Sequence, residues 1–224
     1  ALNSFITKDG LEMGRAQVEQ AWACGLEPRV EMNPVLIKPE GETRAQVVVM
    51  GRPLRTLEAS AYFRRDWTDR LARLAHAAYR RLERSYQPML LEGAGSLGEI
   101  NLWDRDFVNL PMARRVNARI LLVGDIERGG IFAALLGTLD LLPPADRARV
   151  VGLVVNRFRG DTGLFEEGRR MLEERAGLPV LGVIPWLPDL ELGAEDALLR
   201  RHWSAEEGRG PVCRVGVVLL RRLS

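Results

Sequence analysis

The chain has 224 residues, 46% of them hydrophobic and 28% charged, which excludes a disordered, collagen-like or coiled-coil protein. Its 32 basic and 30 acidic residues leave a formal net charge of +2, so charge offers no reason to expect nucleic acid as a partner. No apolar run is long enough to cross a bilayer. Without a secretory leader, the expected compartment is the cytoplasm.

Both ends of the sequence predict a piece of a longer protein. The chain begins at Ala1 without a methionine, and it ends at Ser224 directly after the apolar run 215–220. A strand at that run would normally have something to follow it. The two cysteines, Cys24 and Cys213, lie far apart and form no ligand spacing, so a zinc site is not expected.

Helices and strands alternate along the second part of the chain. Residues 66–86 predict an amphipathic helix, because their apolar residues share one face and their arginines the other. Helices are also predicted at 131–141 and at 163–176, the latter ending at Gly177. Five short apolar runs predict buried strands: 89–91, 120–123, 151–155, 180–184 and 215–220. This order predicts an α/β fold with an open, mainly parallel sheet flanked by helices and covered on both faces.

Polar, glycine-bearing segments follow three of these strands, at 92–96, 124–130 and 156–161. Because ligands bind at the carboxyl ends of parallel strands, this pattern indicates a site for phosphate and metal. Glu92 either holds Mg²⁺ beside phosphate oxygens or caps a helix. Asn156 either reads the edge of a purine or bonds its own backbone.

The segment 99–106 interleaves charged and amide residues with large apolar ones. It is either a buried, salt-bridged loop or a loop that handles substrate, in which carboxylates and an arginine orient ammonia and a carboxylate. The motif G-x-x-x-x-G-K-[ST] does not occur in the sequence. For a nucleotide enzyme, the main phosphate loop is therefore expected upstream of Ala1.

These residues resemble the cobyric acid synthases, glutamine-dependent amidases of cobalamin biosynthesis. The resemblance covers nearly the whole chain, and no single segment would be specific alone. The segments that carry it are 1–5, 12–17, 32–39, 91–109, 125–133 and 156–161.

The resemblance implies a P-loop NTPase-like domain, similar to dethiobiotin synthetase, over 1–205. It implies that 206–224 are a linker and the first strand of a class I glutaminase-like domain. Without its first strand, phosphate loop and ammonia source, the chain is expected to be inactive by itself.

The implied activity is an ATP- and glutamine-dependent amidation. It converts the b, d, e and g carboxylates of adenosylcobyrinic acid a,c-diamide through acyl phosphates into adenosylcobyric acid. The implied cofactors are ATP and Mg²⁺, and the implied partners are a corrinoid and glutamine-derived ammonia, with a homodimer left open. The alternatives are a related amidase of the cobyrinic acid a,c-diamide synthase type and a non-catalytic remnant.

The resemblance also implies roles for particular residues. The metal ligands would be Glu92 and Glu12. The nucleotide would be bound by Asn156, as the adenine reader, and by Arg157. The remaining implied positions are substrate-binding Asn3, Ser4 and Asn101, and catalytic Asp104, Asp106 and Asp125.

Overall fold

The computed structural model describes residues 4–40, 44–58 and 65–187, and the chain forms two compact units. Of the described residues, 4–40 and 44–58 belong to the first unit and 65–187 to the second. The strand predicted at 215–220 and the linker before it lie outside the described residues.

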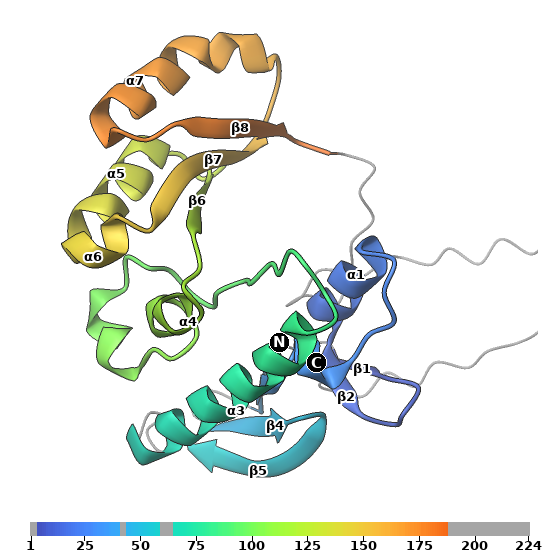
Figure 1. Cartoon of the computed structure of the whole chain (residues 1–224). Coiled ribbons are helices and arrows are strands. Elements are labelled where there is room, and N and C mark those ends of the chain that lie inside the picture. The colour runs from blue at the N-terminus through green and yellow to red at the C-terminus, as the bar shows by residue number, and fades with distance from the viewer. Residues whose placement is uncertain (1–3, 41–43, 59–64, 188–224) are drawn as a thin grey trace, which may run out of the picture. The chain divides into compact units, whose positions relative to one another are not determined.

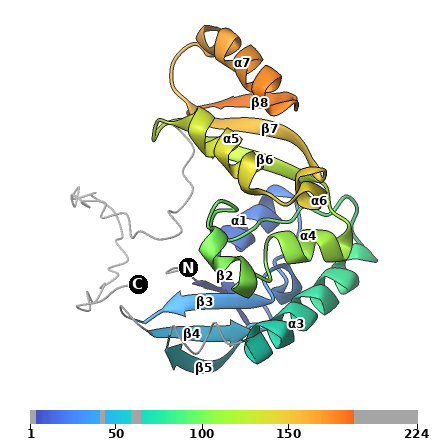
Figure 2. The ribbon, with the colours of Figure 1, turned by 90° about the vertical axis from the view of Figure 1, so that its left-hand side faces the viewer.

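The first unit contains a hairpin, a helix and a three-stranded antiparallel sheet (Figures 1 and 2). Strands β1 and β2 pair in the hairpin, and the sheet has the order β3-β4-β5. None of these elements was predicted from the sequence. They are β1 (Ser4–Ile6), β2 (Glu12–Gly14), α1 (Arg15–Ala23), the 3-10 helix η1 (Val30–Met32), β3 (Val35–Pro39), β4 (Arg44–Val49) and β5 (Arg52–Glu58).

The turn between β4 and β5 consists of Met50 and Gly51, both with positive φ, at 47° and 74°. Two such residues make the two-residue hairpin turn whose twist matches that of the flanking strands. A Cβ at Gly51 would lie 2.6 Å from Leu11 Cβ and 2.7 Å from Val30 Cγ1. Glycine is therefore required both by the backbone and by the small core beneath it, which is centred on Met13, Val18 and Val30.

The second unit contains a parallel sheet of order β6-β7-β8 and the helices that flank it. This confirms the predicted α/β class. Its elements are α3 (Arg65–Glu83), the 3-10 helix η2 (Ile100–Arg105), α4 (Leu110–Val116), β6 (Ile120–Asp125), α5 (Ile131–Leu141), α6 (Pro144–Arg147), β7 (Val150–Phe158), the 3-10 helix η3 (Thr162–Phe165), α7 (Glu166–Ala176) and β8 (Val180–Pro185).

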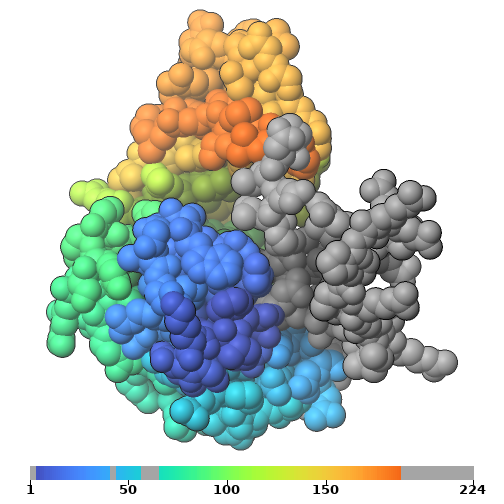
Figure 3. All heavy atoms as spheres, turned by 90° about the vertical axis from the view of Figure 1, so that its right-hand side faces the viewer, coloured from blue at the N-terminus to red at the C-terminus, as the bar shows by residue number. Residues whose placement is uncertain are grey.

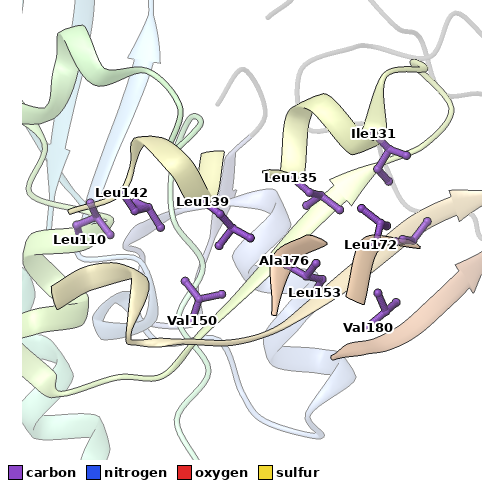
Figure 4. Close-up of a cluster of buried hydrophobic side chains, with 11 residues drawn as sticks. Leu110, Ile131, Leu135, Leu139, Leu142, Val150, Leu153, Leu172, Ala176 and Val180 are labelled. Carbon is purple, nitrogen blue, oxygen red and sulfur yellow. The ribbon is translucent and has the colours of Figure 1, made fainter. Parts of the chain in front are cut away.

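Helices α5 and α7 contact each other and bury one face of the sheet. Figure 4 shows the side chains of this core, among them Leu135, Leu139, Leu153 and Leu172, all of which are at most 2% exposed. Burial of this size stabilises a fold by about 1.5–3 kcal/mol for each large side chain. On strand β6 the side chain of Leu121 is 52% exposed. The predicted cover on both faces is therefore not what the described residues show.

Four of the predicted elements in the second unit are confirmed at 120–123, 131–141, 151–155 and 180–184. Helix α7 ends as predicted, at Gly177, whose φ of 66° is the left-handed cap that favours glycine. The strand predicted at 89–91 is wrong. These residues form no strand, and Leu90 is 86% exposed. An apolar run becomes a strand only where a neighbouring backbone pairs with it.

Candidate functional site

The carboxyl ends of β6, β7 and β8 carry a cluster of charged and aromatic side chains. Asp125, the last residue of β6, stands opposite Asn156 of β7 in the register of the two strands. The amide of Ile126 then donates to the carbonyl of Asn156 at 3.1 Å. The structure thus brings Asp125, Asn156 and Arg157 together, as the sequence predicted for neighbouring strand ends.

Arg157 bridges the two loops that follow β6 and β7. Its Nη1 donates to Asp125 Oδ2 at 3.1 Å, and its Nη2 is paired with the carboxylate of Glu127. Arg159 donates to the same carboxylate from Nε at 3.1 Å. These side chains are between 28% and 56% exposed, so each pair adds only about 0–1 kcal/mol to stability. Their effect is on the position of the loops.

Trp186, just after β8, joins this cluster. Its backbone amide donates to the carbonyl of Phe158 at 2.7 Å. The guanidinium carbons of Arg159 and Arg157 lie 3.8 and 4.8 Å from the centre of its indole ring. Such cation–π contacts contribute about 0.5–1 kcal/mol at exposed sites. All three strand ends are therefore linked through two arginines.

Asn156 bonds its own backbone, since its Oδ1 accepts the amide of Arg157 at 2.9 Å. Arg157 has a φ of 64°, in the left-handed region that is uncommon for residues with a Cβ. The register with β8 is irregular between Val155 and Phe158. Of the two interpretations of Asn156, the structure shows the bond to its own backbone. Recognition of a purine edge by Asn156 stays a prediction.

The turn that contains Glu92 is held by Asn109, which precedes α4. Asn109 accepts the amide of Ala94 at 3.1 Å and donates to the carbonyl of Ala94 at 2.8 Å. A Cβ at Gly93 would lie 1.9 Å from Asn109 Oδ1, so a larger residue there would displace Asn109 from these hydrogen bonds. Glu92 itself is exposed and lies outside the helices and strands. Both interpretations of Glu92, as a metal ligand and as a helix cap, therefore stay predictions.

The loop at 99–106 forms the 3-10 helix η2, and none of its helical residues is buried. The alternative of a buried salt-bridged loop is therefore wrong. Asn101 and Asp104 are exposed on η2. Asp106 follows η2, and its Oδ1 accepts the amides of Val108 at 2.8 Å and Asn109 at 3.0 Å. Asp106 thus fixes the turn that leads into α4.

A second cluster lies in the first unit and brings together two predicted residues, Glu12 and Ser4. The carboxylate of Glu12, on β2, accepts a hydrogen bond from Lys38 Nζ of β3 at 2.6 Å and another from the Ser4 side chain. Burial raises the pKa of Glu12, but these hydrogen bonds and the charge of Lys38 lower it, and the net result is a lowered pKa. The third predicted residue of this region, Asn3, lies outside the described residues.

Among the described residues, no three His, Cys, Asp or Glu side chains gather closely enough to hold a metal ion. The predicted ligands Glu12 and Glu92 belong to different units, and Glu12 is paired with an ammonium group. Mg²⁺ is usually held by one or two carboxylates together with phosphate oxygens and water, and the exposed carboxylate of Glu92 has the chemistry of such a ligand. The Mg²⁺ site stays a prediction.

Sequence reasoning missed four residues of these two clusters: Lys38, Glu127, Arg159 and Trp186. Two of them had a signal in their spacing. Asp125 and Arg157 are 32 positions apart, and so are Glu127 and Arg159. One β-α-β repeat separates each pair, which places both members at the same edge of the sheet. Lys38 had a signal in composition, because Lys8 is the only other lysine.

Throughout the part of the chain that the structure describes, no helix has the length and apolar character needed to span a membrane.

A family model described as an AAA domain matches residues 43–193, in agreement with the predicted P-loop NTPase-like α/β fold. The chain is 47% identical to the cobyric acid synthase of Bacteroides fragilis over 224 residues, which are all of this chain and 45% of that protein. It is 46% identical to the cobyric acid synthase of Geobacillus kaustophilus over 218 residues, or 97% of this chain and 43% of that protein. It is 50% identical to the cobyric acid synthase of Sorangium cellulosum over 228 residues, which cover 100% of this chain and 43% of that protein.

The chain thus spans less than half the length of these relatives. No solved structure matches it.

Proposed function

Since this chain belongs to the AAA-domain family, we propose that it performs the ATP-dependent step of cobyric acid synthesis. In this proposal, the b, d, e and g carboxylates of adenosylcobyrinic acid a,c-diamide become amides, and the product is adenosylcobyric acid. Glutamine supplies the ammonia, and the reaction takes place in the cytoplasm.

The chemistry requires two transfers for each carboxylate. A carboxylate oxygen attacks the terminal phosphorus of ATP, ADP leaves, and an acyl phosphate forms. The nitrogen of ammonia then attacks the acyl carbon, loses a proton and expels phosphate. A carboxylate is a poor electrophile until phosphate becomes its leaving group, and phosphoryl transfer depends mainly on positioning and on cationic stabilisation.

The observation that carries the proposal is the cluster at the strand ends of the second unit, in a chain similar along its whole length to cobyric acid synthases. In our assignment Asn156 and Arg157 bind the nucleotide. With Oδ1 of Asn156 turned to its own backbone, the Nδ2 group is the part that can donate to a purine nitrogen. Arg157 places a guanidinium group beside Asn156 at the carboxyl end of β7.

Asp125 is assigned a more indirect part. Its Oδ1 accepts the amide of Glu127 at 3.0 Å, and its Oδ2 accepts from Arg157 at 3.1 Å. With both oxygens engaged, Asp125 positions Arg157 rather than reacting itself. We assign the corrinoid carboxylate to Asn3, Ser4 and Asn101, and the handling of the intermediate to the carboxylates Asp104 and Asp106.

The test uses a chimera in which this chain replaces the matching 45% of the Bacteroides fragilis protein. The chimera is incubated with Mg-ATP, an ammonium salt and the diamide substrate, and the corrinoid is followed by mass spectrometry. Ammonium removes any need for glutamine hydrolysis, so the result reports on this segment. We expect stepwise conversion of carboxylates to amides by the chimera and no conversion by the 224-residue chain alone.

Two controls make the outcome interpretable. The intact Bacteroides fragilis protein shows that the assay works, and urea unfolding shows whether the chimera folds. A folded chimera that leaves the diamide unchanged would contradict the proposal. If that chimera instead amidates cobyrinic acid itself, the related amidase of the cobyrinic acid a,c-diamide synthase type is the correct reading.

A further inference from the structure

Lys38 is one of only two lysines in a chain with 32 basic residues. The composition therefore favours arginine strongly wherever a positive charge is wanted. Arginine is a planar fork with five donors, whereas lysine is a compact point charge with three. A lysine at a largely buried position of such a chain indicates a need for the compact ammonium group.

The position of Lys38 fits this need. Its Nζ lies 2.6 Å from Glu12 Oε1, and the two side chains are only 26% and 11% exposed. Ser4 bonds the same carboxylate from a third element, β1. The other lysine is in a different situation. Lys8 pairs with Glu27 at 2.8 Å, but there the side chains are 80% and 54% exposed.

This arrangement presents donors toward an anion. Glu12 takes one of the three N–H groups of Lys38, which leaves two that can bind further oxygens. Ser4 is exposed, and Figure 3 shows the first described residues of the chain, in dark blue, at the surface of the first unit. The donors of Ser4 and Lys38 thus meet at one carboxylate, that of Glu12, which holds the ammonium group in place.

We propose that Lys38 is a catalytic residue whose ammonium group binds an anionic oxygen of the reactants, with Glu12 positioning it. The inference rests on the proposed function, in which an oxyanion has two sources: the carboxylate of the corrinoid and the phosphoryl group transferred to it. A preorganised cation at such an oxygen stabilises charge that develops during the reaction.

The simpler explanation is that the Glu12–Lys38 pair ties the β1-β2 hairpin to the β3-β4-β5 sheet. Arginine would serve such a tie as well as lysine, since its fork is well suited to a carboxylate. The two explanations therefore differ in what the conservative substitution Lys38→Arg does to binding and to turnover.

The experiment compares Lys38→Arg with Lys8→Arg as the matched control, since both keep the charge and both lysines pair with a glutamate. The chimera with each substitution is tested for its melting temperature and for binding of Mg-ATP and of the diamide. The chimera is tested for kcat and KM with ammonium. Lys38→Met, which removes the charge, is the second variant.

We expect Lys38→Met, which removes the donor, to lower kcat/KM by roughly 10²–10³-fold. Lys38→Arg keeps the charge but misplaces the donor, so it should lower kcat/KM at least tenfold, with the melting temperature within about 2 °C of the parent. Lys8→Arg should stay within about twofold of the parent. A loss of affinity for the diamide assigns the oxygen to the carboxylate. A loss in ATP binding or ADP release assigns it to the phosphoryl group.

Turnover and binding of Lys38→Arg that match those of Lys8→Arg, in a parent that makes amides, would overturn the assignment of Lys38 alone. Equal losses of stability and activity would identify the pair as a tie between strands. A folded parent that makes no amide would overturn the proposed function, and with it the role of Lys38. If Lys38→Arg does not fold, Lys38→Met takes its place in these comparisons of turnover, binding and stability, because Met removes the donor without adding a larger head group.

Discussion

The ion pair of Arg114 and Asp146 joins α4 to α6 in the second unit, and its loss should destabilise the chain measurably. Asp146 is 1% exposed, and Arg114 donates to it from Nε at 2.7 Å and also from Nη2. Substituting Arg114→Met leaves the carboxylate buried without its main donor. Breaking a fully buried pair costs about 3–5 kcal/mol, and an exposed pair is worth about 0–1 kcal/mol. Because the Arg114 side chain is 51% exposed, we expect a cost of about 2–3 kcal/mol.

The pH dependence of this cost follows from the pKa of Asp146. Hydrogen bonds from Arg114 lower it below the ordinary value of 3.8, outweighing burial, which raises it. A lowered pKa in the folded state contributes stability above about pH 3.8 that is lost as the pH falls through the folded-state value. In Arg114→Met, burial raises the pKa of Asp146, so acid stabilises the variant by protonating the carboxylate. The difference between the two proteins should therefore be largest at neutral pH and shrink in acid.

The assay is urea unfolding followed by circular dichroism at several pH values between about 7 and 3. The matched control is Arg115→Met, which removes the same charge from an exposed neighbouring position on α4. We expect the control to stay within about 0.5 kcal/mol of the parent. A cost for Arg114→Met below that of the control, or a cost that does not change with pH, would refute the reasoning.

Three further pairs of substitutions test packing, backbone conformation and a turn. Leu135→Ala, at a side chain only 2% exposed, should cost about 2–5 kcal/mol in urea unfolding, whereas Leu164→Ala, at an 82% exposed side chain, should cost less than about 0.5 kcal/mol. Gly51 and Gly10 share a positive φ near 74°, but only a Cβ at Gly51 would meet neighbouring atoms. The melting temperature should therefore fall further in Gly51→Ala than in Gly10→Ala. Equal losses would show that the contacts at Gly51 do not matter. Asp106→Asn keeps an oxygen acceptor for the amides of the turn, so it should unfold like the parent, while Asp106→Ala should cost about 1 kcal/mol. If Asp106→Asn in the chimera amidates as fast as the parent, the charge of Asp106 has no part in the chemistry.

Much of the second unit could be predicted from the sequence because the signals there are local. The helix at 131–141 and the strands at 120–123, 151–155 and 180–184 follow from apolar periodicity and from glycines that end or begin helices. The first unit was missed, although its β4-β5 turn at Met50 and Gly51 has a clear backbone requirement. Its strands mix charged and apolar residues, so their pattern resembles that of a loop.

Other features depended on tertiary structure, because a local pattern does not contain its own partner. The apolar run 89–91 has the composition of a strand, but strand formation requires a second backbone, and Leu90 is exposed instead. For the candidate sites, the apolar runs alone were enough to predict Asp125, Asn156 and Arg157 at the carboxyl ends of neighbouring strands.

Which side chains pair with one another depends on the tertiary structure. It turned Asn156 toward its own backbone, placed Glu127 between two arginines, and set Lys38 against Glu12 from another sheet. The physical reason is that element type follows from backbone hydrogen bonding and periodicity within a few residues. Contacts between residues 26 or 32 positions apart follow from the register and packing of strands, which the whole fold determines.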